Sequence, residues 1–300
     1  MAADQQDEQG NFVNRFAKDG ALSPLSFFQG NGWPTFCLHT QLRMGKGLFD
    51  LCNREVYSIT PLVYGQGTDI SLSRHACGRT LEAYLHRRFR GISRPSADTF
   101  AEFFVHCKNT TCELDEVSRS KLNPGQVQIA LDFICDLVEE GVSPIQITVI
   151  TPYKANRDCI ETVRRGPKYV SLASMPPAST VDGFQGREND IIIAILGTTR
   201  ESGPGFTTNQ SRLNVMFSRQ RSGLVIFGDI NLLGNLTEPS SQQQRQLIRA
   251  KGRQNKMLIS KDGGTSKRDW ANVGMLGSVL ESLWRSGRFG TASQGDRLGS

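Results

Sequence analysis

A crowded polar loop, TVDGFQGREND at residues 180–190, is followed at once by the apolar run IIIAIL. A buried strand needs only a turn before it, and a turn does not need an amide, a guanidinium and a carboxylate together. The loop holds all three, in Gln185, Arg187 and Glu188. Such side chains bind phosphates, ribose hydroxyls and nucleic-acid backbones. The loop therefore predicts contact with a nucleotide and with a nucleic-acid strand.

Three further stretches carry similar chemistry, and their order along the chain is informative. They are QLRM at 41–44, TPYKAN at 151–156 and RLNVMFSRQRSGLVIFGD at 212–229. With the loop at 180–190, they resemble the second RecA-like domain of superfamily 1 helicases. The group with the nonsense-mediated-decay helicase, senataxin and the NAM7-type helicases is the most similar. The resemblance covers roughly residues 11–235 and rests mainly on the last two stretches in tandem.

The resemblance implies half of an ATP site. Arg43 and Arg219 match the two arginines that reach the γ-phosphate from the second domain, where a permanently charged guanidinium stabilises phosphoryl transfer. Glu188 matches an acceptor for the ribose, and Gln185 a residue that couples the nucleotide to the bound strand. Arg221 belongs to the same nucleotide-contacting set. The cofactor implied is ATP with Mg²⁺, completed by a first motor domain.

Contacts to single-stranded RNA or DNA are implied at Thr151, Tyr153 and Thr180. Hydroxyl groups at these positions would bind the backbone, which carries no base information. Gly183 and Gly186 would allow the backbone to approach closely.

The chain departs from the family in a few places. Leu42 stands where an aromatic usually stacks on adenine, and Asn156 replaces a glutamine. No G-x-x-x-x-G-K-[ST] phosphate loop occurs in the 300 residues, and no strand ending in Asp-Glu precedes residue 41. We therefore expect the chain to be inactive alone as an ATPase. A non-catalytic nucleic-acid- or protein-binding module and a degenerate helicase fragment are the alternatives.

Apolar patterning predicts an α/β fold, with a RecA-like parallel sheet flanked by helices and no phosphate loop of its own. Strands are expected at 100–107, 145–153, 169–174, 190–199 and 224–229. Helices are expected from near residue 44, over 123–141, 154–165 and 209–223, and at 275–284. The polar clusters are expected at the carboxyl ends of the strands, where such sheets place ligands.

We expect three segments: an N-terminal remnant at 1–35, the RecA-like domain at 36–233 and a basic, largely flexible tail at 234–300. The tail contains 11 Lys+Arg and 5 Asp+Glu, whereas the remaining residues contain 24 of each. The net charge of +6 therefore lies entirely in the tail, which predicts attraction to phosphate backbones or simply a solvated extension.

The remaining composition limits the class of protein. No apolar run approaches the roughly 20 residues that cross a bilayer, and the first residues are polar and acidic. Seven cysteines without framework spacing favour reduced thiols in the cytoplasm or nucleus. They do not form a tight C-x-x-C pair, so no metal site is expected.

Overall fold

The computed structural model describes residues 23–58, 62–234, 236, 256–260, 268–272 and 274–296. The chain divides into two compact units, residues 1–39 and 40–300. In the first unit, α2 (Pro24–Gly30) begins at Ser23, whose Oγ accepts a hydrogen bond from the backbone N–H of Ser26 at 3.0 Å. The second unit holds all the residues considered below.

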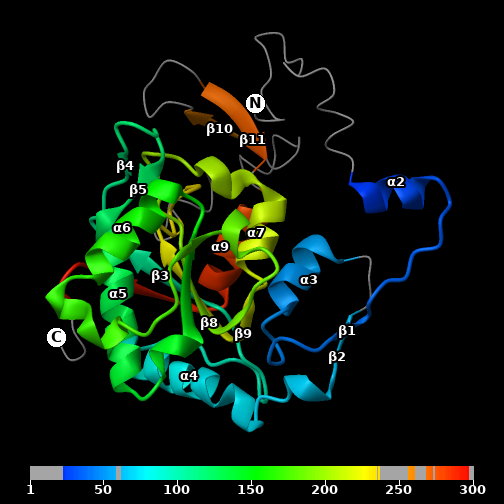
Figure 1. Ribbon diagram of the computed structural model, residues 1–300, viewed down its shortest axis with the longest axis horizontal. Coiled ribbons are helices and arrows are strands. Elements are labelled where there is room, and N and C mark those ends of the chain that lie inside the picture. The colour runs from blue at the N-terminus through cyan, green and yellow to red at the C-terminus, as the bar shows by residue number, and fades with distance from the viewer. Residues whose placement is uncertain are drawn as a thin grey trace. The chain divides into compact units, whose positions relative to one another are not determined.

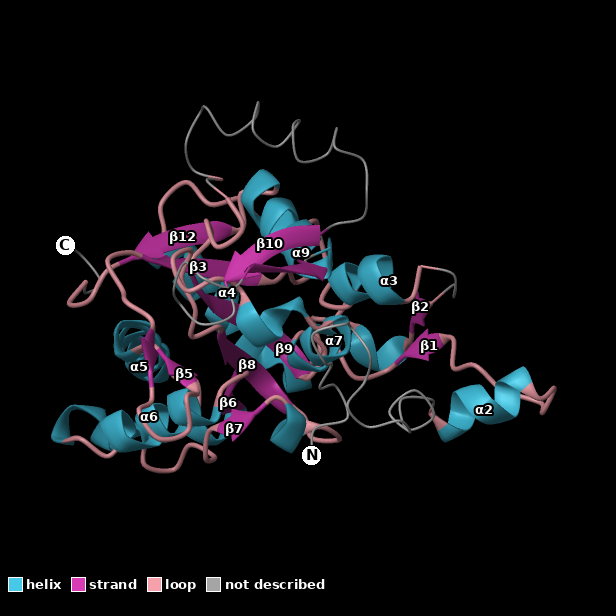
Figure 2. Cartoon of the chain, turned by 90° about the horizontal axis from the view of Figure 1, so that it is seen from above, coloured by secondary structure: helices cyan, strands magenta, loops and turns pink. Residues whose placement is uncertain are grey.

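A six-stranded parallel sheet forms the centre of the second unit (Figures 1 and 2). Its spatial order is β12-β3-β9-β8-β6-β7. The strands are β3 (Phe103–Cys107), β6 (Ile147–Thr151), β7 (Ser179–Thr180), β8 (Asn189–Ile195), β9 (Gln220–Gly228) and β12 (Phe289–Ala292). Every pairing in it is parallel, which confirms the predicted fold class.

Alternate residues of each strand enter two separate cores, one on each face of the sheet. Ile191, Ile193 and Ile195 pack on one face, and Ile192 and Ala194 pack on the other. Because side chains alternate along a strand, an uninterrupted apolar run is what a sheet covered on both faces requires.

Two groups of helices cover these faces (Figure 1). On the first lie α4 (Ala76–Arg88), α5 (Pro124–Glu139) and α6 (Lys154–Arg164). On the second lie α3 (Asp50–Val56), α7 (Gln210–Met216) and α9 (Gly274–Arg285). Three small sheets complete the described strands: parallel β1 (Thr40–Gln41) with β2 (Val63–Tyr64), antiparallel β4 (Glu113–Leu114) with β5 (Lys121–Leu122), and antiparallel β10 (Lys256–Ser260) with β11 (Arg268–Asn272).

The start of α5 follows its predicted capping. Asn123 Oδ1 accepts from the N–H of Gln126 at 3.0 Å, and Pro124 takes the first helical position. The Gln126 side chain then bonds the loop after β8, donating to Thr198 O and accepting from Gly197 N, both at 2.9 Å. The helix start is thereby fixed to the carboxyl edge of the sheet.

Three local expectations are wrong. The segment 169–174 is not a strand, because residues Pro167–Leu172 form a 3₁₀ helix held by Tyr169, which donates to Asp132 on α5 at 2.9 Å. The helix expected near residue 44 begins only at Asp50. Helix α7 ends at Met216, and β9 already begins at Gln220.

Gly223 therefore lies within β9 and does not end a helix. A Cβ there would lie 2.4 Å from Leu81 Cδ2, and one on Gly78 would lie 2.3 Å from Ser222 O. The two glycines let α4 approach β9 closely, which is why the sequence has glycine at both positions. Helix α4 itself was absent from the expected elements.

The expected tail boundary is also wrong for residues 274–296. Helix α9 buries Leu276, Val279 and Leu280 against the second face, and β12 pairs with β3 as the sixth strand. The sequence pattern did predict this helix, at 275–284, but not its place in the core. Most of the remaining tail lies outside the described residues.

Candidate functional site

The predicted nucleotide residues meet at the amino-terminal ends of β8 and β9. Glu188 directly precedes β8, and Arg219 directly precedes β9. Asn189 and Gln220, the first residues of the two strands, are neighbours in the sheet. The expectation that these clusters lie at the carboxyl edge is therefore wrong for the charged residues, because each stands before its strand and not after it.

Arg43 reaches the same edge from an irregular segment far away in the sequence. Gly45 donates its N–H to Arg221 O at 2.7 Å, so the segment lies beside the first residues of β9. The carbonyl of Lys46 accepts from Phe100 N, and Lys46 N donates to Thr68 O, each at 2.8 Å. These backbone bonds, and not a helix, position the arginine.

Arg43 contacts two groups at this edge. Its Nε lies 2.5 Å from Glu188 Oε2, and its Nη1 donates to Ser218 O at 2.9 Å. Arg219 turns to the same serine, with Nη2 donating to Ser218 Oγ at 3.0 Å and Nε donating to Val215 O at 3.1 Å. Ser218 thus holds the two predicted phosphate-contacting arginines side by side.

The two guanidinium groups raise the positive potential at this point. Partial burial, together with the nearby charge of Arg43, lowers the pKa of Arg219. The guanidinium still carries its charge at neutral pH, because arginine is not deprotonated in proteins. An anion would relieve the repulsion between the two cations, and this is the electrostatic requirement of a phosphate site.

Arg221 adds a third cation to the cluster. Its Nε lies 2.8 Å from Asp190 Oδ1 without hydrogen-bond geometry, and its Nη1 lies 3.9 Å from Glu188 Oε1. Glu188 is therefore shared between two arginines. The side chains of Arg43, Arg221 and Glu188 are 34%, 34% and 39% exposed, so all three can still reach a ligand.

The segment 181–188 connects the two ends of the sheet. Thr180 pairs with Thr151 at the carboxyl end of β6, whereas Ile191 pairs with Ile147 at its amino end. The intervening residues must therefore run back along the sheet, and Val181 and Phe184 pack on its second face as they do so. Gln185 lies within this segment with an exposed side chain.

Thr180 lies at the carboxyl end of β7, half-buried, and its Oγ1 accepts from Gly183 N at 3.2 Å. The next residues are held by a bidentate pair, in which Arg212 Nε and Nη2 each lie 3.1 Å from an Asp182 oxygen. Gly186 has a φ of +82°, a left-handed conformation that glycine adopts without strain.

Thr151 and Tyr153 are buried, which differs from the predicted surface contact of their side chains. Thr151 has no exposed surface, and its Oγ1 accepts from Asn156 Nδ2 at 2.9 Å. Tyr153 is stacked on Phe206 with ring centroids 5.4 Å apart, and its hydroxyl accepts from Phe206 N at 3.0 Å. Both side chains instead support the loops at the carboxyl edge.

Leu42, in the position of the family's aromatic, is 61% exposed beside Arg43. Sequence reasoning missed Ser218 and the Arg212–Asp182 pair, although both stand inside the motifs. No pattern signals that a serine will bind two arginines through its carbonyl and its hydroxyl. Only the fold brings these atoms together.

Two classes of feature are not found in the described ranges. No group of three or more His, Cys, Asp or Glu residues there is placed to hold a metal ion. None of the helices described is both long and apolar enough to cross a bilayer.

Comparison with known proteins agrees with the geometry. The AAA domain family AAA_12 matches residues 22–231, over two thirds of the chain. "Helicase required for RNAi-mediated heterochromatin assembly 1" of Schizosaccharomyces pombe is 31% identical over 147 residues, 47% of this chain and 14% of that protein. "Regulator of nonsense transcripts 1" of Caenorhabditis elegans is 34% identical over 134 residues, 44% of this chain and 12% of that protein.

A third relative, "DNA-binding protein SMUBP-2" of Rattus norvegicus, is 33% identical over 125 residues, 40% of this chain and 12% of that protein. Each match thus spans less than a sixth of the relative's length. Among solved structures, the helicase nsp10 of PRRSV matches with a TM-score of 0.24 and 13% identity, covering 78% of this chain and 31% of that one. The family match decides the assignment: the chain belongs to the AAA_12 family, the C-terminal RecA-like region of superfamily 1 helicases.

Proposed function

We propose that this domain supplies the second half of an ATP site, with Arg43 and Arg219 directed at the phosphates and Glu188 at the ribose. The arginines fit the role because they are held 2.9 and 3.0 Å from atoms of one residue, Ser218, and keep unused N–H donors. Guanidinium groups held in this way stabilise charge that develops on phosphate oxygens. Glu188 has two oxygens and can accept from a ribose hydroxyl.

ATP and its Mg²⁺ would be bound mainly by a first RecA-like domain, because the 300 residues contain no phosphate loop. The residues of this domain would orient the ribose and neutralise charge on the phosphates. Arg221 stays near Glu188 at 3.9 Å and keeps that carboxylate at the strand end. The site therefore depends on a partner domain, on the same or a separate chain.

The second part of the proposal concerns a single strand of RNA or DNA. Thr180 and the backbone around Gly183 would contact its phosphates at the carboxyl edge of the sheet, without base preference. Thr151 and Tyr153 would support the loops at this edge through their buried side chains. Such a role fits a protein of the cytoplasm or nucleus.

One observation carries the proposal: residues 181–188 begin beside Thr180, the proposed strand contact, and end at Glu188, the proposed nucleotide contact. The segment is a continuous covalent link between the two proposed contacts, and Val181 and Phe184 pack it on the core. Gln185 is an exposed residue in the middle of the segment 181–188, and we infer that it couples the nucleotide site to the strand site.

The test uses a chain that joins this domain to a first RecA-like domain. Arg219→Ala and Arg43→Ala should each lower strand-stimulated ATP hydrolysis on the order of 10³-fold, as for other arginines aimed at a transferring phosphoryl group. Arg94→Ala removes an exposed arginine away from this cluster and should leave turnover unchanged. The 300-residue chain alone should show no strand-stimulated turnover. A loss of less than tenfold for Arg219→Ala would refute the proposal.

The alternative, a non-catalytic binding module, is separated by the same assay. Such a module would bind a strand equally well whether or not Arg43 and Arg219 are present, and would not hydrolyse ATP even when joined to a first domain. The clustering of Arg43, Arg219 and Arg221 around Glu188 favours the nucleotide role, because strand binding alone does not require it.

A further inference from the structure

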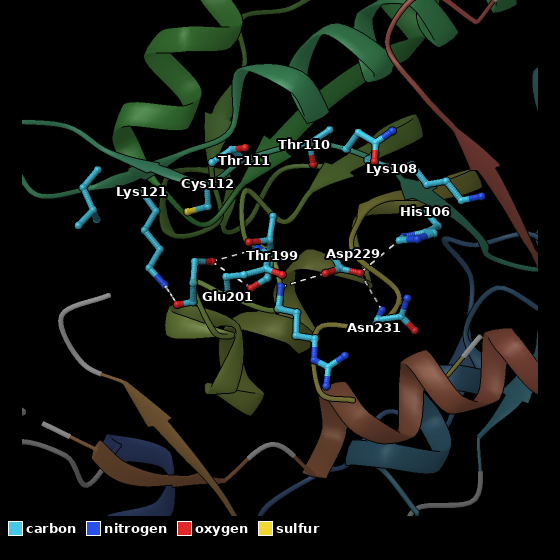
Figure 3. Close-up of a pocket in the computed structure, with 15 residues that line it drawn as sticks. His106, Lys108, Thr110, Thr111, Cys112, Lys121, Thr199, Glu201, Asp229 and Asn231 are labelled. Carbon is cyan, nitrogen blue, oxygen red and sulfur yellow. Dashed lines mark hydrogen bonds and ion pairs between the residues drawn. The ribbon is translucent and has the colours of Figure 1, made fainter. Parts of the chain in front are cut away.

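A cavity of about 860 Å³ lies at the opposite end of the strands from the arginine cluster (Figure 3). Its walls come from the segments that follow β3, β8 and β9, together with the β4–β5 hairpin. The residues that the argument uses are His106, Lys108, Thr110, Thr111, Lys121 and Asp229. Asp229 is the last residue of the stretch at 212–229, and the other five residues lie outside the motifs that the proposed function uses.

The cavity lies where the topology of the sheet reverses. β3 and β9 are neighbours, yet α5, which follows β3, packs on the first face, whereas α9, the next helix after β9 in the described part of the chain, packs on the second. The chain segments leaving adjacent strands diverge there and open a crevice. In open α/β sheets, this crevice outside the carboxyl ends is the usual place for a ligand.

The carboxylate of Asp229 in the cavity is already hydrogen-bonded within the protein. Asp229 accepts from Arg200 N and from Asn231 N, each at 2.9 Å, and its Oδ1 lies 3.6 Å from His106 Nδ1 (Figure 3). Its carboxylate therefore ties together the loops after β8 and β9. Glu201 is the other acid that lines the cavity, and its side chain is exposed.

The remaining polar groups offer donors. Lys121 Nζ donates to Ser202 O at 2.5 Å and Gly203 O at 3.3 Å, and its third proton remains for a ligand. Lys108 and Thr111 are exposed on the loop after β3. His106 Nδ1 accepts from Ile230 N at 3.2 Å, which leaves Nε2–H as the donor of the neutral ring.

We propose that this cavity binds one nucleotide unit, with the phosphate on the loop of Lys108 and Thr111 and the base between that loop and residues 199–202. The ammonium group of Lys108 and the hydroxyls of Thr110 and Thr111 on this loop suit a phosphate, and Lys121 lies on the opposite wall (Figure 3). The volume exceeds what a phosphate alone requires and lies in the range of pockets for small ligands. Amide and hydroxyl groups on the walls suit the edge of an unstacked base.

A free mononucleotide and one residue of a single strand both carry this unit. If the bound unit is one residue of a single strand, the inference rests on the proposed function, which places a strand near Thr180 at the same carboxyl edge of the sheet. If the bound unit is a free mononucleotide, the inference is independent of the proposed function. In both cases the cavity is distinct from the arginine cluster, which lies at the amino edge.

The test titrates the 300-residue chain with adenosine monophosphate and follows its histidine side chains by NMR. His106 lines the cavity, whereas His86 lies on α4, paired with Glu82 at 3.1 Å. The proposal expects shifts at His106 and none at His86. Lys108→Ala combined with Thr111→Val should weaken binding at least tenfold, and the matched Arg94→Ala less than twofold. Both changed side chains are exposed, so the fold should persist.

An octameric single strand then distinguishes the sources. Displacement of adenosine monophosphate from His106 identifies a residue of the strand as the occupant, and persistence of the shifts identifies the free nucleotide. Binding that leaves His106 unmoved, or that the Lys108 and Thr111 changes do not weaken, would overturn the proposal. So would loss of binding through Arg219→Ala, which would place the nucleotide at the amino edge. In a chain that also carries the first RecA-like domain, ATP hydrolysis that Arg219→Ala leaves unchanged would refute only the proposed function.

Discussion

Two arginines at the same edge of the sheet are used in opposite ways. Arg43 is one third exposed and holds Glu188 and a single carbonyl. Arg288 is 3% exposed and pairs with both oxygens of Glu82, at 2.7 and 2.8 Å. Arg288 also donates to the carbonyls of Ser93, Ala101 and Glu102, at 2.9, 3.2 and 3.4 Å, so all of its nitrogens are occupied.

The difference separates a structural ion pair from one available to a ligand. A buried arginine must satisfy every donor inside the protein, because an unpaired charge there costs several kcal/mol. A half-exposed arginine can leave donors to water and exchange partners at little cost. The number of internal partners, and not the ion pair itself, therefore indicates which arginine is free to act on a substrate.

The largest effect should follow from breaking the buried pair. Arg288→Ala leaves Glu82 without its bidentate partner, removes bonds to three carbonyls and exposes the face of Phe103, which the guanidinium covers at 5.4 Å. We expect a loss of about 3–5 kcal/mol in the free energy of unfolding. Chemical denaturation measures it, with Arg94→Ala within about 0.5 kcal/mol as the control. A loss below about 1 kcal/mol would show that the two arginines do not differ as argued.

A smaller effect should come from Glu102, which lies beside Arg288 but is not paired with it. The pKa of this carboxyl is raised to about 7, chiefly by burial and also by the charge of Asp50, and a backbone hydrogen bond, Arg288 and Arg54 oppose the shift. Between about pH 4.5 and 7, the unfolded chain ionises while the folded chain keeps the proton. Stability therefore falls as pH rises through this window and is level above it.

Glu102→Gln removes this titration. Relative to the wild type, the variant should gain on the order of 2–3 kcal/mol between pH 5 and pH 8. Taking the difference between the two proteins cancels the opposite trends of His75 and His106, whose pKa values burial lowers. Denaturation curves at several pH values measure it. Parallel pH profiles for the two proteins would exclude a buried, titrating Glu102.

The exposed pair should matter little for stability. Arg43→Ala and Glu188→Ala should each cost less than about 1 kcal/mol, because exposed ion pairs contribute about 0–1 kcal/mol. In a chain that carries the first domain, Glu188→Ala should mainly weaken nucleotide binding, through loss of the ribose acceptor. Thermal melts and nucleotide titrations measure the two effects. A loss of stability well above 1 kcal/mol from Glu188→Ala would show that Glu188, like Glu82, belongs to an ion pair that stabilises the fold.

The smallest effect on stability belongs to Gln185→Ala, within about 0.5 kcal/mol for an exposed side chain. Its expected effect is on coupling: strand stimulation of ATP hydrolysis should fall while nucleotide affinity stays unchanged. Arg94→Ala, at an exposed residue outside this segment, is the control. Equal stimulation in the Gln185 variant and the wild type would remove that residue from the link between the two edges.

The sequence was sufficient for the elements with strong periodicity or clear caps. The run at 191–196 predicts a strand covered on both faces, and Asn123 with Pro124 predicts the start of α5, because these are local physical requirements. The structure also brings together Arg43, Glu188, Arg219 and Arg221, four of the residues that the motifs predict to contact a nucleotide. The prediction failed at YVSLAS, residues 169–174, which resembles a strand by local pattern, whereas Pro167–Leu172 form a 3₁₀ helix that contacts α5 through Tyr169.

Two further results could not be derived from local patterns. A polar loop lies at the carboxyl edge of the sheet if it follows a strand and at the amino edge if it precedes one. Residues 181–188 follow β7 and precede β8, so they run from one edge to the other. The role of residues 274–296 depends on an unpaired edge of β3 that only the assembled sheet presents. Long-range pairing of this kind leaves no trace in a window of ten residues.

The position of β12 has a consequence for how the protein is made. β3 lies near residue 105 and its outer partner near residue 290, so the ribosome must synthesise almost the whole domain before this pairing can form. Until then, β3 is an open edge of large apolar residues, and Glu82 lacks its ion-pair partner Arg288. Native contacts between such distant residues slow folding and prolong the exposure of aggregation-prone edges. Nascent chains arrested before residue 288 should therefore be the species that chaperones retain.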